Sequence, residues 1–428
     1  MKRTICMVLC VLLCIGLFGC GKAEQTPVTT QPEPLPPLQV GYGRVDISPD
    51  PGIPLQGYSN SSNRLCNEVT EPLYATCIAF TDQTGNTVLL YHLDLTTTKE
   101  KVFDPIREEI AENTGVPFEQ ILLASTHTHS APDLDNLLAK SYTKQLNEWL
   151  LKAAQLAMAD RTEASVSVAE AYPEDLNWVR YYNYSDGTWG SGTLPPGAKR
   201  ESHIRDADNQ LQMIRFVREG AKDVFLVNWQ GHPHRDGGDD KLNATSDMVG
   251  AMRKELEMRD EDALFAYFSG ASGNVNNHSY IKGVTTTADY YEHGKALVDY
   301  MVAAKFSPVE SAPIQLLYET ESLTSKGDHT KALEFPLCVF SLGDIAFVMA
   351  PYEMFDTSGQ YIKSHSGFKM TFVVTYANAH RGYLPTLDAF EADSSYEVRI
   401  TKVIKGSAEE MELKFTEMLD QMYRKSNP

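Results

Sequence analysis

The sequence predicts an α/β fold, a single large domain built on a mixed sheet or on two packed sheets. Three observations lead to this class. From Leu38 onward, short apolar runs alternate with amphipathic stretches. Strand-like and helix-like segments interleave without the strict rhythm of a parallel βαβ array. The chain of 428 residues is 42% hydrophobic and 10% aromatic, so it can bury a large core.

Short apolar runs identify the strands. Residues 88–95 (VLLYHLDL) are almost continuously apolar, as expected of a buried strand. Residues 338–342 and 345–349 flank Gly343 and Asp344, which predicts a hairpin. Further strands are expected at 121–124, 166–168, 211–217 paired with 224–229, 264–268 and 372–376.

Apolar residues at helical spacing predict the helices. Val102, Phe103, Ile106 and Ile110 share one face, and Gly115 ends that helix. The other helices are expected at 146–157, 287–305 and 407–424.

Residues 1–19 have the layout of a lipoprotein signal peptide. Lys2 and Arg3 precede an apolar stretch that ends in Gly19 and Cys20. A small residue before a cysteine resembles a bacterial lipobox, in which the cysteine is lipidated. We therefore expect an extracytoplasmic protein, anchored to the bacterial membrane through Cys20. An ordinary signal peptide is the alternative, and the apolar run is short for a membrane span.

Residues 20–37 are rich in proline and threonine and predict a tether, with the hydrolase domain over 38–428. Within that domain lie three cysteines, Cys66, Cys77 and Cys338. They are too few for a disulfide framework. The sequence leaves open a Cys66–Cys77 bridge or three buried free thiols.

The charge balance excludes some partners. Lys and Arg number 38 against 57 Asp and Glu, a net charge of −19. An acidic surface repels phosphate backbones, which argues against nucleic acid. A small-molecule or lipid substrate remains, with the membrane reached through the N-terminal lipid.

Polar side chains follow several predicted strands directly, where α/β folds collect their sites. His127 and His129 share one side of an extended chain after 121–124. The other segments are 228–234, 350–353 and 378–383. Two imidazoles with a carboxylate form a usual catalytic zinc set. The sequence has no HExxH, P-loop, clear GxSxG or GxGxxG motif, so the corresponding enzyme classes have no support.

Several segments in a fixed order resemble the catalytic domain of the neutral/alkaline, non-lysosomal ceramidases. The resemblance extends over about residues 38–400. The segments are GYGRVDISP at 41–49, 54–58 ending in Gly57-Tyr58, PLYA at 72–75, Asp94-Leu95, STHTHSAP at 125–132, Asn228-Trp229 with His232-Pro233, Ser246-Asp247 with Val249-Gly250, Ser272-Gly273-Asn274, 351–353 and Gly382-Tyr383.

The resemblance implies roles for particular residues. The family's zinc ligands correspond to His127, His232, Glu353 and Tyr383. His129 resembles the histidine placed for proton transfer, and Arg180 the arginine that holds the reacting carbonyl.

Each of these residues also has a structural interpretation. The histidines can be hydrogen-bonded core residues, His129 can brace His127, and His234 can replace His232. Glu353 can lie at a helix N-terminus. Tyr383 can be a core tyrosine and Arg180 an ion-pair residue.

Two departures from the family pattern bear on the substrate. Asn276 stands where ceramidases have a serine that is needed for activity on ceramide, and an amide is not a nucleophile. We also expect no C-terminal immunoglobulin-like domain. We therefore expect little activity on ceramide itself.

The resemblance implies a zinc-dependent amidohydrolase acting on an N-acyl lipid or related N-acyl compound. Zinc would activate water, Arg180 would stabilise the oxyanion and His129 would protonate the leaving group. The alternatives are a zinc esterase or deacetylase acting on glycan or cell-wall material, and a non-catalytic ligand-binding lipoprotein.

Overall fold

The computed structural model describes residues 38–426, apart from 59–60, 235–238 and 312. The signal peptide, Cys20 and the tether therefore lie outside the described residues. The described residues belong to one compact unit. No helix among the described residues is long and apolar enough to cross a membrane.

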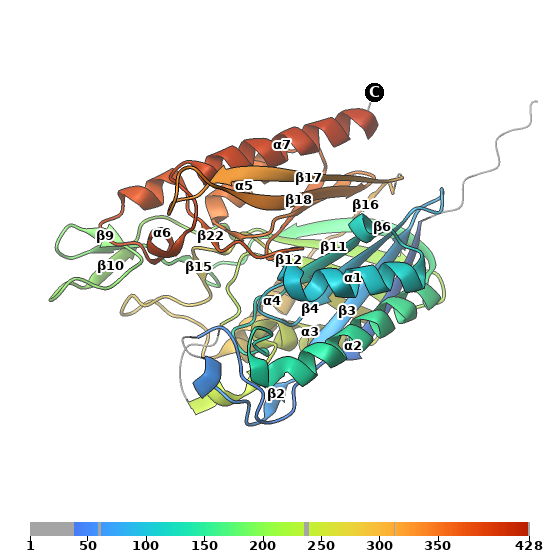
Figure 1. The fold of residues 1–428 in the computed structure, drawn as a ribbon, viewed down its shortest axis with the longest axis horizontal. Helices are drawn as coiled ribbons and strands as arrows, with labels where there is room; N and C mark the ends of the chain where they lie inside the picture. Colours follow the sequence, from blue (N-terminus) through green and yellow to red (C-terminus); the bar gives the residue numbers. More distant parts are fainter. Residues whose placement is uncertain (1–37, 59–60, 235–238, 312, 427–428) are drawn as a thin grey trace, which may run out of the picture. The chain divides into compact units, whose positions relative to one another are not determined.

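A mixed nine-stranded sheet forms the larger layer of the domain (Figure 1). The strand order is β14-β12-β11-β6-β1-β3-β4-β5, and β16 also pairs with β6. The pairs β4–β5 and β12–β14 are parallel and the other pairs are antiparallel. The strands are β1 (Gln39–Asp46), β3 (Tyr74–Thr81), β4 (Thr87–Leu93), β5 (Ile121–Ser125), β6 (Thr162–Ala171), β11 (Leu211–Arg218), β12 (Asp223–Trp229), β14 (Ala263–Ser269) and β16 (Ser307–Val309).

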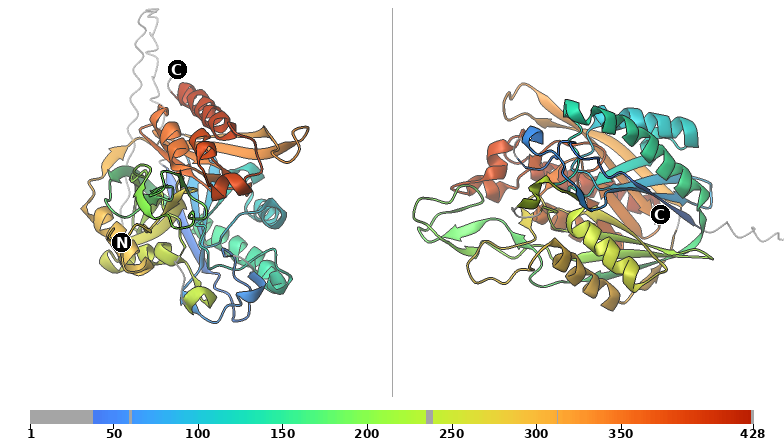
Figure 2. Two further views of the ribbon diagram at one scale, coloured as in Figure 1. Left: turned by 90° about the vertical axis from the view of Figure 1, so that its left-hand side faces the viewer. Right: turned by 90° about the horizontal axis from the view of Figure 1, so that it is seen from below.

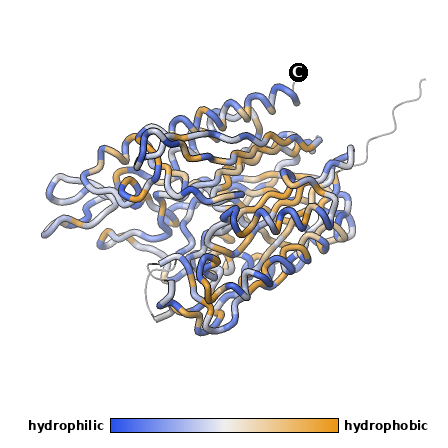
Figure 3. Tube along the Cα trace, viewed as in Figure 1, coloured by the Kyte–Doolittle hydropathy of each residue, from blue (hydrophilic) through white to orange (hydrophobic). Residues whose placement is uncertain are grey.

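A second sheet packs on the inner face of the first. It has the order β17-β18-β19-β21, with β19 and β21 parallel. Its strands are β17 (Ile314–Thr324), β18 (Ala332–Leu342), β19 (Ile345–Met349) and β21 (Met370–Val374). Alternate side chains of both sheets, such as Phe80 and Phe216 from the first and Phe340 and Phe372 from the second, form one core between them. Figure 3 shows this apolar interior.

Helices cover the outer face of each sheet (Figure 2). On the larger sheet, α1 (Glu100–Thr114) and α2 (Lys140–Ala159) pack on one half. Helices α3 (Asp247–Arg259) and α4 (Tyr290–Ala303) pack on the other half of the same sheet. On the smaller sheet lies α7 (Ser407–Ser426), with α5 (Asp356–Ser364). The result is an α/β/β/α sandwich.

Short elements complete the described chain. The small strand pairs are β2 (Val69–Glu71) with β13 (Ala244–Thr245), β7 (Trp178–Val179) with β15 (Val275–Asn276), and β20 (Glu353–Met354) with β22 (Tyr383–Leu384). A three-stranded sheet contains β8 (Tyr182–Tyr184), β9 (Trp189–Gly190) and β10 (Arg200–His203). Helix α6 (Tyr396–Ile400) and the 3-10 turns Ser61–Asn63, Phe118–Gln120, Leu137–Ala139, Asp239–Leu242 and Leu387–Glu391 lie between them.

The predicted α/β class and its mixed sheet are confirmed, and of the two arrangements left open, two packed sheets is the observed one. The predicted hairpin is β18–β19, and 211–217 pairs with 224–229 as β11–β12. Helix α3 was not predicted, because both its apolar residues and its polar Asp247, Arg253 and Glu255 are buried, so no apolar stripe marks it. Cys66, Cys77 and Cys338 are buried free thiols, so no Cys66–Cys77 bridge forms.

The carboxyl ends of strands from both sheets meet at one place. The loop after β21 joins the first sheet where Tyr376 O accepts from Ser125 N at 3.3 Å and Thr375 N donates to Ser269 O at 2.9 Å. The edge strands β5 and β14 also meet there, since Ser269 Oγ donates to Thr126 O at 2.8 Å. The loops that follow these strands therefore face one another.

Candidate metal centre

Four of the sequence-predicted residues lie in the loops at these strand ends. His127 follows β5, and His232 follows β12. Glu353 and Tyr383 open β20 and β22, where they are register partners. All four side chains are buried. The two-stranded β20–β22 pair thus fixes a carboxylate beside a phenol, although the residues are far apart in the sequence.

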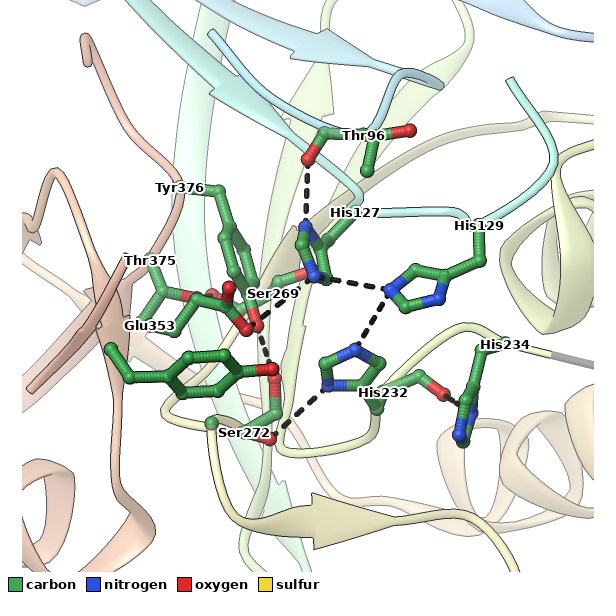
Figure 4. Close-up of polar contacts among 12 residues, drawn as sticks. Thr96, His127, His129, His232, His234, Ser269, Ser272, Glu353, Thr375 and Tyr376 are labelled. Carbon is green, nitrogen blue, oxygen red and sulfur yellow. Dashed lines mark hydrogen bonds and ion pairs between the residues drawn. The ribbon is translucent and has the colours of Figure 1, made fainter. Parts of the chain in front are cut away.

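Hydrogen bonds on the outer ring nitrogens orient two of the histidines (Figure 4). His127 Nδ1 lies 2.7 Å from Thr96 O, and His232 Nδ1 lies 3.4 Å from Ser272 O. A carbonyl only accepts, so each Nδ1 carries the proton and each Nε2 has a free lone pair. Metal-bound histidines are usually oriented in this way.

The Nε2 atoms converge at metal-ligand spacing. His129 Nε2 lies 3.3 Å from His127 Nε2 and 3.0 Å from His232 Nε2. Glu353 Oε2 lies 3.6 Å from His127 Nε2. Ligands about 2.1 Å from a tetrahedral zinc are about 3.4 Å apart. The three imidazoles therefore form a group that could hold a metal ion, with Glu353 at its edge.

Electrostatics also favour a cation at this point. Burial, followed by the neighbouring His380, lowers the pKa of His127 to about 3, so its imidazole is neutral. Burial likewise holds the pKa values of His129 and His232 well below the ordinary value. Glu353 Oε2 is buried and has no hydrogen-bond partner among the described residues. A group of neutral imidazoles beside an unpartnered, buried carboxyl oxygen suits a metal ion.

The backbone around the cluster is strained. His127, Tyr376 and Asn378 adopt positive φ values of 65°, 55° and 59°, a region that costs non-glycine residues energy and is concentrated at functional sites. Tyr376 stacks on His127 with ring centroids 3.8 Å apart and an interplanar angle of 3°. Asn378 Oδ1 accepts from Leu123 N at 2.9 Å. Tyr376 was not predicted as a site residue, because it only follows an apolar strand and belongs to no motif.

His129 occupies a position that fits either of two roles. Its Nε2 lies between the Nε2 atoms of His127 and His232, while its buried Nδ1 has no partner among the described residues. Gly57 packs against its backbone at φ 115°, and a Cβ on Gly57 would lie 2.3 Å from His129 Cα. The geometry is therefore compatible with a third metal ligand as well as with a proton carrier. The close approach also explains the glycine at position 57.

Arg180 joins the cluster to a buried carboxylate. Its guanidinium donates to Tyr383 Oη at 3.1 Å, to Gly273 O at 2.8 Å and to Glu397 at 2.6 Å. Burial alone would lower the pKa of Arg180, but Glu397 and Tyr383 outweigh it and hold that pKa well above its ordinary value. Arg180 is thus an ion-pair residue that also contacts the phenol beside Glu353. Glu397 was not predicted from the sequence.

The remaining predicted residues surround this core. Asn276 is buried in β15, and its Oδ1 has no partner among the described residues. It lines, with Arg180 and His234, a cavity of about 210 Å³. The His234 ring centroid is 5.0 Å from that of His232, whose Nε2 is the one directed to the cluster. His380 is half-buried, and burial lowers its pKa to about 4.

Comparisons with known proteins identify the fold. No family model matches the chain, and no curated protein matches it. Among solved structures, neutral ceramidase from Pseudomonas aeruginosa is similar, with a TM-score of 0.73 and 14% identity over 91% of this chain and 75% of that one. A ceramidase complexed with C2 has a TM-score of 0.74 and 14% identity over 91% and 76% of the two chains. The chain therefore has a neutral ceramidase-like fold.

Proposed function

We propose that this protein is a zinc-dependent hydrolase that cleaves an amide bond in an N-acyl lipid or a related N-acyl compound. One observation carries the proposal. The Nε2 atoms of His127 and His232 converge with that of His129 at metal-ligand spacing, and a buried, unpartnered carboxylate oxygen of Glu353 lies 3.6 Å from His127 Nε2. Structures named as ceramidases share the fold, which supports acyl hydrolysis at this position.

The residues present fit a zinc ion. His127, His232, Glu353 and Tyr383 would hold it, with His129 either completing the set or carrying protons. Zinc, when bound, supplies Lewis acidity that polarises a carbonyl and acidifies water. Arg180 holds the Tyr383 hydroxyl and borders the adjacent cavity, where its guanidinium can stabilise an oxyanion. A neutral His129 can accept a proton and pass it to the leaving group.

Asn276 argues for a substrate other than long-chain ceramide. Its buried amide lines the cavity beside Arg180 and has an unpartnered Oδ1. A site built around one polar contact rejects ligands that leave its groups unpaired. We therefore propose a smaller or less hydroxylated acyl compound.

The test combines metal analysis with a substrate panel. Purified full-length protein should contain about one zinc per chain and hydrolyse the amide bond of N-acyl compounds. Chelation should abolish turnover, and added zinc should restore it. A protein that binds no metal near neutral pH would disprove the metal centre, and cleavage of O-acyl esters without any cleavage of N-acyl amides would favour the esterase alternative.

We also propose that the protein is a lipoprotein held at the membrane through Cys20. Two acyl chains on one cysteine would give stable anchoring, at about 0.8 kcal/mol per buried CH₂. Replacement Cys20→Ala should release the protein into the soluble or secreted fraction. Unchanged membrane association of this variant would contradict the proposal.

A further inference from the structure

The cavity beside the candidate centre contains two arginines whose environments differ. It measures about 210 Å³ and is bordered by Arg180, Arg200, Asn276 and Glu397. A water molecule occupies about 30 Å³ in the liquid, so the cavity can take a small chemical group. His234 also borders it, and its ring centroid is 5.5 Å from that of His129. The cavity therefore adjoins the histidine cluster.

The charge of Arg180 is neutralised within the protein. Its Nε donates to Glu397 Oε1 at 2.6 Å. Glu397 is almost fully buried and also accepts from Tyr181 Oη at 2.9 Å and from Ser191. Arg180 and Glu397 thus form a closed buried pair, which is fixed before any ligand arrives.

Arg200 has no such partner. Its guanidinium carbon lies 5.1 Å from the ring centroid of Tyr182 and 5.4 Å from that of Tyr280, so two aromatic rings hold it. Its Nε is buried and bonds to no group among the described residues. Within residues 38–426, apart from the gaps at 59–60, 235–238 and 312, no carboxylate forms an ion pair with it. A guanidinium group that is held in position and has no anionic partner can bind an anionic ligand.

The cavity wall is positive in an acidic protein. Among the described residues that line the cavity, two guanidinium groups, of Arg180 and Arg200, stand against one carboxylate, that of Glu397, which leaves one positive charge. The whole chain carries a net charge of −19. Because low-dielectric walls concentrate a local field, this charge attracts an anion into the cavity although the protein as a whole repels anions.

We propose that Arg200 binds an anionic group of the substrate, so that the N-acyl substrate carries a carboxylate or a phosphate close to its acyl bond. The proposal rests on the proposed hydrolase function. A planar guanidinium binds either anion through two parallel hydrogen bonds. The rings of Tyr182 and Tyr280 orient the guanidinium group of Arg200. Arg180 and Asn276 line the same cavity, so an anion bound there lies beside the candidate centre. Ceramide carries neither group, which agrees with the departure at Asn276.

Binding to metal-free protein tests this without turnover. Titration calorimetry would compare N-acetylglycine with N-acetylglycinamide, and N-acetylethanolamine phosphate with N-acetylethanolamine. Each anion should bind about 10- to 100-fold more tightly than its neutral partner, as expected for a charged hydrogen bond. The tighter of the two anions identifies the natural group. Equal binding of the anionic and neutral partners would overturn the proposal.

Three variants locate the effect. Arg200→Gln should abolish the preference for the anion, and Arg200→Lys should keep part of it. Lys199→Gln removes the same charge from the exposed neighbouring residue, which does not border the cavity, and should change nothing. Loss of the preference in Lys199→Gln, or its retention in Arg200→Gln, would show that Arg200 is not the binding group.

Kinetics of the zinc-loaded protein separate this proposal from the proposed function. Arg200→Gln should raise the KM of the anionic substrate about 10- to 100-fold relative to the KM of the neutral one. Turnover without any preference for the anion would overturn the role of Arg200 and leave the hydrolase intact. An Arg200-dependent preference in binding without any turnover would leave the anion site intact and refute the hydrolase.

Discussion

Two buried histidine groups in this protein differ in how their ring nitrogens are satisfied. His92, in β4, accepts from Tyr267 N at Nδ1 over 2.6 Å and contacts Asp94 Oδ1 through Nε2 at 2.9 Å. Asp94 in turn accepts from Arg253 at 2.5 Å. In the candidate centre, His127 Nε2 faces His129 Nε2 and Glu353 Oε2, and His232 Nε2 faces His129 Nε2.

The comparison separates a structural histidine from a candidate ligand. Both groups are buried and both carry lowered histidine pKa values, so neither burial nor pKa distinguishes them. The two groups differ in whether each hydrogen-bond acceptor faces a donor. Around His92 each acceptor has a donor, whereas the centre brings three Nε2 atoms together beside a carboxyl oxygen that has no partner among the described residues. Four predictions follow from this difference.

The largest effect should come from removing a ligand. His232→Ala should lose the metal and lower kcat/KM at least about 10³-fold, because the metal contributes several kcal/mol to the transition state. His365→Ala, at an exposed histidine outside the centre, is the matched control and should keep both. Metal content by mass spectrometry and initial rates measure the two effects. Normal metal content in His232→Ala would place His232 with His92 as a structural histidine.

The second effect concerns stability. Asp94→Asn leaves Arg253 charged and buried without a full partner, which should reduce the free energy of unfolding by about 3–5 kcal/mol. Glu353→Gln in metal-free protein should change it by less than about 1 kcal/mol, because Oε2 has no partner to lose. Urea denaturation of both variants gives the values. A larger loss of unfolding free energy in Glu353→Gln than in Asp94→Asn would contradict the assignment of Asp94 to a structural group and of Glu353 to a metal site.

Metal addition should stabilise the centre alone. Zinc at 100 times its Kd should raise the free energy of unfolding by about 2.7 kcal/mol, since it binds only the folded state. The stabilisation should persist in Asp94→Asn and disappear in His232→Ala. Thermal unfolding with and without zinc measures it, and an equal response in both variants would contradict a site at the three histidines.

The smallest effect is the pH dependence of the structural group. Burial lowers the pKa of His92 below its ordinary value of 6.5. The unfolded chain therefore binds the proton more readily than the folded one. The stability contributed by neutral His92 is present above about pH 6.5 and is lost as pH falls below it, by up to about 1.4 kcal/mol per pH unit. The unfolding free energy of His92→Gln should fall less steeply below pH 6.5, and parallel curves would contradict this.

Local pattern was enough to predict the most continuously apolar strands, but not β1, β3, β16 or β17 and not every helix. Strands such as β4, β12 and β19 are continuous apolar runs, which can be recognised without knowing what they pack against. Helix α3 buries Arg253 and Glu255 together with its apolar residues, so no apolar stripe marks it. Its polar groups are satisfied by distant partners such as Asp94, and no local pattern reveals these.

Some residues of the candidate site could be predicted from the sequence and others could not. Polar motifs at strand ends indicated His127, His232, Glu353 and Tyr383, and the structure brings all four to one region. Tyr376 and Glu397 belong to no motif, and a long-range stack and an ion pair bring them into the site. The role of His129 stays a prediction, because its ring lies where either role is possible.

The sequence by itself determined the α/β class, the most continuously apolar strands and the residue types of the candidate metal centre, since these depend on periodicity and on short polar segments. Only the tertiary structure decided how the two sheets pack and that their strand ends meet. It also decided which ring nitrogens face one another and that Arg200 stands unpaired beside Arg180. The physical reason is that lone-pair direction and charge compensation depend on partners up to hundreds of residues away, such as Glu397 for Arg180. Only the folded chain brings those partners together.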